Sequence, residues 1–486
     1  MPFPHNDIRE FIDDLEKEGE LIRVKREVDW DLEVGAIARR LCETTLGRRV
    51  KEGGQPAALF EKIKGYPEGF RICTMTHGGI QRIAMMLGTK EPDKATYREL
   101  QDLFLEGTAH PMRPNLVKSG PCKENIMMGE EVDLYKFPAP MVHEGDGGRY
   151  LCTFHVVATK DPESEWLNWG MYRAMIHDRR TLGGLIVPGQ HGMMIYQKYE
   201  ARNEPMPFAM AIFSDPLTLL VGACKVPAGV SEMDIIGGLR RQPLDVVKCE
   251  TNDLLVPACS EIVIEGIVPP YKRLYEGPFG EYPGYVSSPR TEKLVYLIQA
   301  ITYRNNPILG MSNMGMPVDD CHMIMTVSMS AILRETLIKN GLPVVDVNMI
   351  PECVDQLVIV STKPYPGVAH MIASVIEATW RVVGANILVV NDDVDVFNPA
   401  EVMHAWTTRI HPERGIHIRR GISNPLLVWG SEEERWKFKI PGILYDATWP
   451  IDWRPGVVPR KSSFKTLYPQ ETQEKVLGNW TKYGFK

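Results

Sequence analysis

The sequence predicts a mixed α+β protein built from three modules. The chain has 486 residues, which is enough for two to four domains at roughly 100–200 residues per domain. Short apolar runs separated by turns fill its middle part, whereas apolar runs alternate with helical patterns after residue 306. We therefore expect an N-terminal α/β domain over residues 1–115, a β-barrel-like domain over 116–305 and a C-terminal α/β domain over 306–486.

The N-terminal module mixes helices with short strands. An acidic amphipathic helix is expected from Asp7 to near Gly19, because an Asp-x-x-Glu start precedes its apolar positions. A second helical pattern covers residues 33–42, and the prolines of 111–114 mark the boundary of the module.

The strands of the other two modules are predicted from short apolar runs. In the middle module these runs are residues 154–158, 185–187, 208–212, 217–221 and 261–265. In the C-terminal module they are residues 344–347, 357–360 and 387–390. A helix is expected to begin after Asn398, because an Asn cap is followed by Pro399 and Glu401.

Charge and composition exclude several classes of function. Lys and Arg number 55 against 62 Asp and Glu, and no long basic run occurs, so nucleic acid is not an expected partner. No apolar run reaches the ~18 residues of a membrane span, and the first residues resemble no targeting signal. The nine scattered cysteines form no Cys-x-x-Cys pair, which is typical of reduced thiols in a cytoplasmic protein. The common phosphate-loop, dinucleotide, nucleophile-elbow and zincin motifs are also absent.

Polar residues in apolar surroundings mark the first candidate site. Asn168, Arg173 and His191 each need a buried partner there. On a regular strand positions 168 and 173 face opposite sides, unless a bulge at Gly170 restores a common face. His191 lies on a tight turn close to Gly189 and Gly192. A hydrogen-bonded structural network explains these residues as well as a ligand site does.

Two acids lie close together on a Gly/Pro-rich loop. Glu276 and Glu281 are too far around a helix to share one face, but a compact loop can direct both into one cavity. Two close carboxylates can keep one charge and one proton, and Arg173 suits the ionised member. The alternative is a solvated loop with two surface acids.

Glu232 opens a predicted helix after a Gly/Pro-rich turn. It could simply compensate the helix dipole. Alternatively, an Asn oxygen, an imidazole and a carboxylate together form a hard, open site for Mn²⁺ or Mg²⁺, completed by a phosphate.

Together these stretches resemble the UbiD-like decarboxylases, which use prenylated FMN, over nearly the whole chain. The resemblance rests on residues 168–173, 190–191, 232, 248–258, 276–281, 391–395, 407–409 and 445–448. It implies a split β-barrel flavin-binding domain and a C-terminal α/β domain that makes homodimers or their multiples. It also implies a flavin prenyltransferase as supplier of the cofactor.

The resemblance assigns roles to individual residues. Asn168, His191 and Glu232 are expected to bind a divalent metal, Mn²⁺ or Mg²⁺, at the cofactor phosphate. A monovalent ion, K⁺, is expected at Val221, Gly222, Cys224 and Glu232. The cofactor is expected to contact Asn168, Trp169, Gly170, Met171, Tyr172, Arg173, Gln190, His191 and Glu232. Arg173, Glu276 and Glu281 match the catalytic Glu-Arg-Glu network, and Arg409 and Asp446 match late motifs.

His322 has two interpretations. It lies at the start of a predicted helix, in a region that approaches the cofactor in this family, where it could select polar-substituted rings. It could equally be a hydrogen-bonded histidine of the first helical turn. The methionine-rich stretch 314–329 is interpreted as core, and Asp392, Asp393 and Asp395 as structural.

The predicted function is reversible, non-oxidative decarboxylation of an aromatic, heteroaromatic or α,β-unsaturated carboxylic acid. Arg173 and Glu276 would hold the carboxylate, the cofactor would accept electrons as CO₂ leaves, and Glu281 would return a proton. Two alternatives are a flavin-independent, metal-dependent lyase or hydrolase, and a non-catalytic subunit of a multi-subunit carboxylase.

Overall fold

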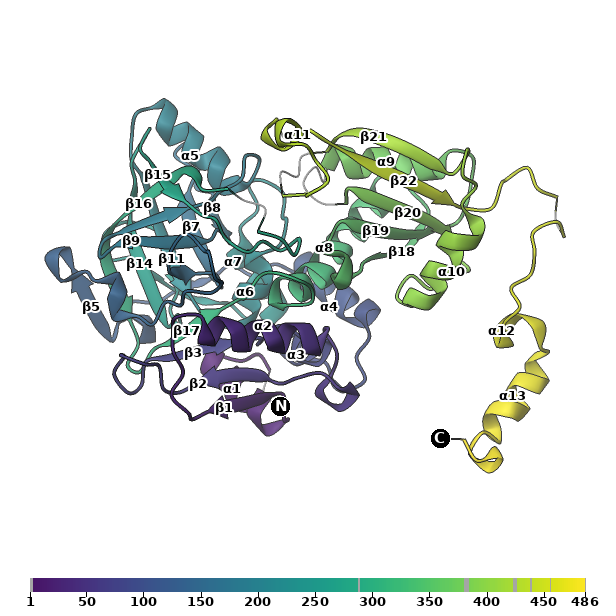
Figure 1. Cartoon of the computed structure of the whole chain (residues 1–486), viewed down its shortest axis with the longest axis horizontal. Coiled ribbons are helices and arrows are strands. Elements are labelled where there is room, and N and C mark those ends of the chain that lie inside the picture. Colours follow the sequence, from purple (N-terminus) through teal and green to yellow (C-terminus); the bar gives the residue numbers. More distant parts are fainter. Residues whose placement is uncertain are drawn as a thin grey trace.

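The protein is described by a computed structural model that covers residues 3–286, 289–379, 384–422, 426–437, 439–454 and 456–485. A barrel-containing lobe and a C-terminal lobe lie side by side, with helix α8 (Asp320–Lys339) at their junction (Figure 1). Among the described helices, none is long and apolar enough to cross a membrane. The mixed α/β fold class predicted from the sequence is confirmed.

The N-terminal sheet has four strands in the order β1-β2-β3-β17. They are β1 (Leu21–Val24), β2 (Ala57–Phe60), β3 (Arg71–Thr74) and β17 (Ile308–Met311). Its helices are α1 (Ile8–Lys17), α2 (Glu33–Thr45), α3 (Ile80–Met86) and α4 (Tyr97–Ala109). The Asp7 side chain accepts a hydrogen bond from the Glu10 amide and so caps α1. Because β17 pairs with β3, the sheet is completed by a strand more than 200 residues further along the chain.

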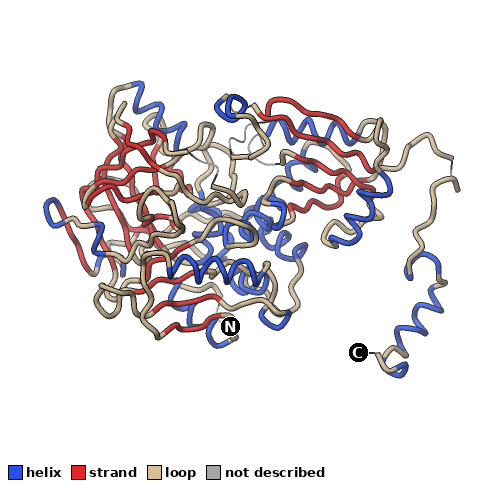
Figure 2. The backbone as a smooth tube through the Cα atoms, in the orientation of Figure 1, coloured by secondary structure: helices blue, strands red, loops and turns tan. Residues whose placement is uncertain are grey.

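The central domain contains a curled sheet of ten strands (Figure 2). Its main path runs β6-β9-β10-β16-β14-β11-β7-β8, and β5 and β15 pair with β16. The strands are β5 (Asn125–Met128), β6 (Tyr150–Cys152), β7 (His155–Lys160), β8 (Leu167–Gly170), β9 (Ala174–Asp178), β10 (Thr181–Gly184), β11 (Met206–Ile212), β14 (Ile262–Val268), β15 (Arg273–Glu276) and β16 (Thr291–Tyr303). Helices α5 (His191–Ala201), α6 (Pro216–Gly222) and α7 (Glu232–Arg240) lie between strands. A small sheet has the order β13-β12-β4, formed by β4 (Asn115–Leu116), β12 (Asp245–Lys248) and β13 (Leu255–Pro257).

The C-terminal domain is a five-stranded sheet in the order β18-β19-β20-β22-β21, with parallel pairing in its centre. Its strands are β18 (Val344–Met349), β19 (Leu357–Thr362), β20 (Asn386–Asn391), β21 (Ile416–Ile422) and β22 (Ile440–Ala447). Alternate residues of β19 face opposite sides, as the strand period requires. Val358 and Val360 pack toward α8 and α9 (Val368–Thr379), while Leu357 and Ile359 pack toward α10 (Pro399–Arg409).

The C-terminal segment leaves the body of the molecule (Figure 1). Helix α11 (Glu432–Trp436) still borders the sheet, but α12 (Phe464–Leu467) and α13 (Gln470–Gly478) contain no buried residue. Several large apolar side chains of this segment are exposed, including Leu477 and Phe485.

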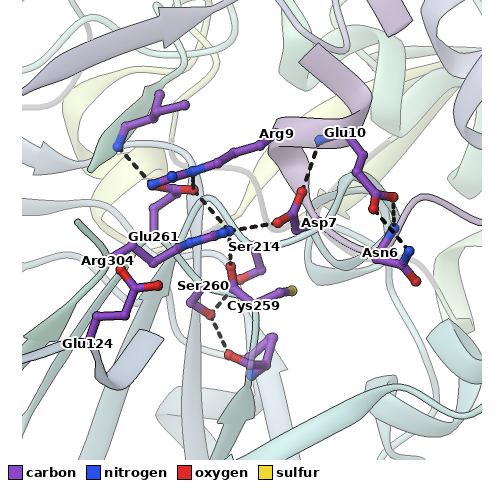
Figure 3. A network of polar contacts seen from close by, with 12 residues as sticks. Asn6, Asp7, Arg9, Glu10, Glu124, Ser214, Cys259, Ser260, Glu261 and Arg304 are labelled. Atoms are coloured by element: carbon purple, nitrogen blue, oxygen red, sulfur yellow. Dashed lines mark hydrogen bonds and ion pairs between the residues drawn. The ribbon is translucent and has the colours of Figure 1, made fainter. Parts of the chain in front are cut away.

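A buried carboxylate fastens α1 to the central domain (Figure 3). Glu261, which directly precedes β14, receives hydrogen bonds from Arg9 Nε and Nη2 at 2.6 and 2.7 Å. Arg304 at the end of β16 lies 3.4 Å from the same carboxylate, and the amide of Ile308 donates to it at 3.0 Å. One acid thereby joins α1, β16 and β17.

Most predicted elements are present, and two are wrong. Asn398 caps α10 with Pro399 in its first turn, as predicted. Residues 217–221 form helix α6 rather than a strand, because Asp215 caps the segment and Pro216 occupies the first turn. Residues 185–187 are an irregular segment after β10. All nine cysteines are free.

Candidate active site

A cavity of about 300 Å³ lies between the central domain and α8. Its wall contains every residue that the sequence analysis assigned to cofactor binding: Asn168, Trp169, Gly170, Met171, Tyr172, Arg173, Gln190, His191 and Glu232. The lining also contains Glu281, Tyr282, Cys321, Ile324, Met325 and Met329. Residues from distant parts of the chain therefore meet at one cavity of a size that can hold a ligand.

Asn168 and His191 lie next to each other although 23 positions separate them. Asn168 is buried near the end of β8, and its Oδ1 lies 3.2 Å from His191 Nδ1 at the start of α5. Strand β8 ends at Gly170, so the chain turns before Arg173 and no regular alternation separates the two faces. A Cβ at Gly170 would lie 2.3 Å from the Tyr172 hydroxyl, which explains the glycine.

Glu232 is the first residue of α7 and is almost completely buried. Its Oε2 accepts a hydrogen bond of 2.9 Å from the Trp169 amide. Burial raises the pKa of Glu232 to about 8, and the backbone hydrogen bonds only partly oppose the shift. No ion pair joins Glu232 to a described Lys or Arg, and a buried carboxyl in such a place is chemically suited to bind a cation.

The donor set at this wall fits a divalent metal. Asn168 offers an amide oxygen, His191 an imidazole and Glu232 a carboxylate, which is an open set suited to Mn²⁺ or Mg²⁺. Burial lowers the pKa of His191, and the nearby Lys225 lowers it further, so the imidazole is kept neutral as a metal ligand must be.

The residues predicted to bind a monovalent ion lie at or next to the same cavity. Val221 and Gly222 form the end of α6, and Gly222 and Cys224 line the cavity together with Glu232. The Val221 carbonyl accepts a hydrogen bond of 2.8 Å from the Cys224 amide.

Arg173 lies between the two acids. Its Nε and Nη2 donate to both oxygens of Glu276 at 2.9 and 3.0 Å, and its Nη1 donates to Glu281. Burial opposes the positive charge, but Glu281 and Glu276 outweigh it and raise the pKa of Arg173. Glu276 and Glu281 are 0% and 3% exposed, so the alternative of two surface acids is wrong.

Two details differ from the expected arrangement of this network. Arg173 contacts both carboxylates rather than Glu276 alone. Glu276 does not line the cavity but lies behind Arg173, where the Tyr150 hydroxyl donates to it at 2.6 Å. Burial and the neighbouring Glu276 raise the pKa of Tyr150, which keeps its hydroxyl proton in place. Sequence spacing could not reveal Tyr150, because it lies on the separate strand β6.

The structure places His322 behind the cavity wall. Its Nε2 lies 2.7 Å from the carbonyl oxygen of Tyr282, and its Nδ1 accepts from the Asp319 amide at 3.2 Å. Both ring nitrogens are therefore engaged, and His322 is absent from the residues that line the cavity. This geometry supports the interpretation as a hydrogen-bonded histidine of the first helical turn.

The methionine-rich stretch belongs to the core, as predicted, and part of it also lines the cavity. Met314, Met325 and Met329 line the cavity, whereas Met323 is fully buried in the core. On a helix, residues 321, 325 and 329 share one face, and this spacing is the signal that could have identified them.

Arg409 and Asp446 belong to a different region. They line a second cavity, of about 500 Å³, in the C-terminal domain. Arg409 forms a double hydrogen bond with Asp393 at 2.8 and 2.7 Å, which agrees with a structural role for Asp393.

Comparison with known proteins covers almost the whole chain. Residues 12–104, 115–317 and 322–437 match the N-terminal, Rift-related and C-terminal domains of 3-octaprenyl-4-hydroxybenzoate carboxy-lyase. The chain is 32% identical to pyrrole-2-carboxylic acid decarboxylase of Pseudomonas aeruginosa, over 99% of this chain and 98% of the relative. It is also 32% identical to ferulic acid decarboxylase 1 of Saccharomyces cerevisiae, over 99% of both chains.

Solved structures agree with this relationship. Vanillic acid decarboxylase of Sedimentibacter hydroxybenzoicus in its closed form has a TM-score of 0.86 at 33% identity, over 98% of this chain and 99% of that chain. The UbiD-class enzyme HmfF of Pelotomaculum thermopropionicum, in complex with FMN, has a TM-score of 0.80 at 29% identity, over 94% and 97%. An evolved dimeric form of HmfF, in complex with prenylated FMN, has a TM-score of 0.77 at 29% identity, again over 94% and 97%. The chain therefore belongs to the UbiD family and is a carboxy-lyase.

Proposed function

We propose that the protein catalyses reversible, non-oxidative decarboxylation of an aromatic, heteroaromatic or α,β-unsaturated carboxylic acid with prenylated FMN. The observation that carries the proposal is Arg173, a buried cation at the cavity wall between Glu276 and Glu281. A cation at such a wall can bind the carboxylate of a substrate through charge-assisted hydrogen bonds.

The contacts of Arg173 divide the roles of the two acids. Glu276 holds Arg173 through two hydrogen bonds and is itself held by Tyr150, so it keeps the guanidinium in place. Glu281 accepts from Nη1 of Arg173, and a substrate carboxylate that binds this nitrogen would displace Glu281 from it. A buried carboxyl that loses its cation takes up a proton more readily, so substrate binding would prepare Glu281 to act as an acid.

The proton balance follows from this arrangement. The bond between the substrate carbon and its carboxylate breaks, and CO₂ leaves. The proton of Glu281 then passes to that carbon, and Glu281 returns to Arg173 as the product departs. The reverse order describes carboxylation.

Prenylated FMN, when bound, supplies an electron sink for the pair of electrons that CO₂ leaves behind. Residues 168–173, Gln190 and His191 would hold it along the cavity wall. Asn168, His191 and Glu232 would hold Mn²⁺ or Mg²⁺ beside the cofactor phosphate, and Val221, Gly222, Cys224 and Glu232 would hold K⁺. A flavin prenyltransferase would supply the cofactor.

The rest of the cavity lining indicates the substrate class. Cys321, Ile324, Met325 and Met329 give it a soft, apolar surface, with Tyr282 at its edge. This lining suits a planar ring or conjugated chain. Pyrrole-2-carboxylate, ferulate, cinnamate and vanillate are therefore the acids to test.

The decisive experiment uses protein co-expressed with a flavin prenyltransferase. We expect a bound chromophore with the mass of prenylated FMN and CO₂ release from at least one of the four acids. Glu281→Gln should keep the metal and flavin but lower the turnover by at least the ~10²–10⁴-fold typical of acid–base groups. In D₂O it should nearly abolish deuterium incorporation at the product carbon.

Three other results would contradict the proposal. Activity of a colourless protein with metal alone would identify a flavin-independent lyase or hydrolase. A flavin-loaded protein without activity on any acid, regained only with a second polypeptide, would identify a subunit of a larger carboxylase. A Glu281→Gln variant that turns over within a few-fold of the wild type would show that the acid lies elsewhere.

We also propose that the protein forms homodimers or multiples of them. Exposed apolar side chains on α13 and the following residues, such as Leu477 and Phe485, support this proposal because they offer apolar surface that a second copy could cover. Light scattering of the purified protein tests it, and a monomer at micromolar concentration contradicts it.

A further inference from the structure

The turn that carries Glu281 is tied to the C-terminal half of the chain through its neighbour Tyr282. The turn itself is short, with the Glu281 amide donating to the Tyr285 carbonyl at 3.0 Å and the Gly284 amide donating to the Glu281 carbonyl at 2.9 Å. Tyr282 packs against the apolar core that α8 shares with the C-terminal sheet. The position of Glu281 therefore depends on what holds residue 282.

Among the described residues of the C-terminal half, two side chains hold Tyr282. His322 Nε2 lies 2.7 Å from the backbone carbonyl of Tyr282, and Gln356 Nε2 donates to its phenolic oxygen at 3.3 Å. His322 belongs to the first turn of α8, and Gln356 directly precedes β19. The main chain and the side chain of one residue are thus anchored to two different elements.

His322 keeps its hydrogen bond to Tyr282 in both of its protonation states. A carbonyl oxygen only accepts hydrogen bonds, so Nε2 must carry the proton. Nδ1 then accepts from the Asp319 amide in the neutral ring, or donates to the Asp319 carboxylate, 2.9 Å away, in the charged ring. In either state Nε2 of His322 keeps its proton and donates it in a hydrogen bond to the Tyr282 carbonyl.

Buried acids surround the ring. Asp319 and Asp355 are both 0% exposed, and Asp355 directly precedes Gln356. Burial alone would lower the pKa of His322, but the neighbouring Asp319 carboxylate outweighs it, so the pKa is raised. The imidazole is therefore fixed by charge as well as by hydrogen bonds, which is more than a simple helix cap requires.

We propose that His322 is a positioning residue, which fixes the turn that carries Glu281 and joins this turn to the C-terminal domain. It acts through the Tyr282 carbonyl and does not touch the substrate. This inference rests on the proposed role of Glu281 as the proton donor. A displacement of about 1 Å at a reacting group can lower the rate about 10²-fold, so a rigid anchor beside the acid has a direct use.

Two amide substitutions separate this role from a general structural one. In His322→Gln the side-chain amide can reach the position of Nε2 and donate to Tyr282. In His322→Asn it reaches only the position of Nδ1 and Asp319. Ser330→Ala is the matched control, because Ser330 Oγ accepts from the Met349 amide at 2.9 Å and so joins α8 to the C-terminal sheet without contacting Tyr282.

The measurements are hydrogen–deuterium exchange of the peptide that spans residues 281–286 and steady-state kinetics of the full-length, flavin-loaded protein. We expect the amides of this peptide to exchange faster in His322→Asn than in the wild type. The kcat of this variant should fall at least about tenfold, with KM little changed. His322→Gln should stay close to wild type in both measurements. Ser330→Ala should lower the melting temperature without a change in exchange at the turn.

Equal losses in the Asn and Gln variants, or unchanged exchange in His322→Asn, would overturn the inference and leave His322 a purely structural residue. If His322→Asn does not fold, His322→Gln decides: near-wild-type kcat and exchange support the role, and their loss overturns it. Glu281→Gln distinguishes the two proposals. A catalytically silent Glu281→Gln refutes the proton donor, whereas a damaged Glu281→Gln beside an unaffected His322→Asn refutes only the anchor.

Discussion

Asp355 is completely buried, and neither of its carboxylate oxygens accepts a hydrogen bond from any described residue. Burial raises its pKa from the ordinary 3.8 to about 7, although the nearby His322 opposes the shift. The folded protein therefore keeps a proton that the unfolded chain has already released, between about pH 4 and 7. The contribution of Asp355 to the free energy of unfolding thus falls as the pH rises through this range.

Asp355→Asn should remove this dependence, because asparagine is neutral and tolerates the positive φ of 58° at this position. We expect the melting temperature of the variant, relative to wild type, to be higher at pH 8 than at pH 5. Scanning calorimetry at the two pH values measures the difference. If the melting temperatures of variant and wild type differed by the same amount at both pH values, Asp355 would not hold its proton as inferred.

Glu232 provides a second test at the level of one residue. Its carboxyl faces the cavity with Asn168 and His191, so Glu232→Ala should release both metal and flavin. Elemental analysis and the absorption spectrum of the purified variant measure the two losses. Asp234→Asn, on the same turn of α7, is the control and should keep both. Full metal content in Glu232→Ala would exclude Glu232 as a ligand.

The position of a single residue in the site could be predicted only where the nearby sequence carried a signal for it. The glycines and prolines around Glu276 and Glu281 suggested that both acids point into one cavity. Both acids do bind Arg173, but Glu276 ends strand β15 and only Glu281 lines the cavity. The sequence could not predict whether His322 lines the cavity or lies behind its wall. Its position depends on Tyr282, a residue 40 positions away, and no periodicity in the sequence encodes that hydrogen bond.

Helix α1 is held to the central domain by a buried ion pair rather than by apolar contacts alone. Arg9→Met would leave Glu261 buried with Arg304 as its remaining cation. Hydrogen bonds to charged groups contribute about 1.5–3 kcal/mol, so the free energy of unfolding should fall by about that amount. Urea denaturation measures the change. The control is Lys94→Met, which removes an ion pair whose two side chains are both exposed. It should change the free energy of unfolding by less than about 1 kcal/mol.

Predicted elements were correct where caps and periodicity agreed, as for α10, whose Asn398-Pro399 start is present in the structure. The prediction failed for α6, because a short apolar run fits a strand and a buried helix equally well. There the decisive signal was Asp215-Pro216, a cap directly before the run, which outweighs the apolar pattern.

At the scale of the whole molecule, changes in pattern along the chain predict three modules, but they do not reveal how strands from distant segments pair. Strand β17 follows the barrel in sequence and yet pairs with β3 of the N-terminal sheet. Pairing between strands so far apart leaves no local trace in the sequence, because each strand shows only its own apolar pattern.

The same long connection has a consequence during synthesis. When the ribosome has finished β1, β2 and β3, the edge of β3 lacks its neighbour and Arg9 lacks Glu261, and both partners emerge some 200 residues later. At about 5–20 residues per second this is an interval of roughly 10–50 seconds in which a bare strand edge is open to wrong pairing. The N-terminal sheet is synthesised first, but its last strand emerges only after the barrel. A ribosome-bound chain should therefore resist protease in its N-terminal part only once residue 311 has left the exit tunnel.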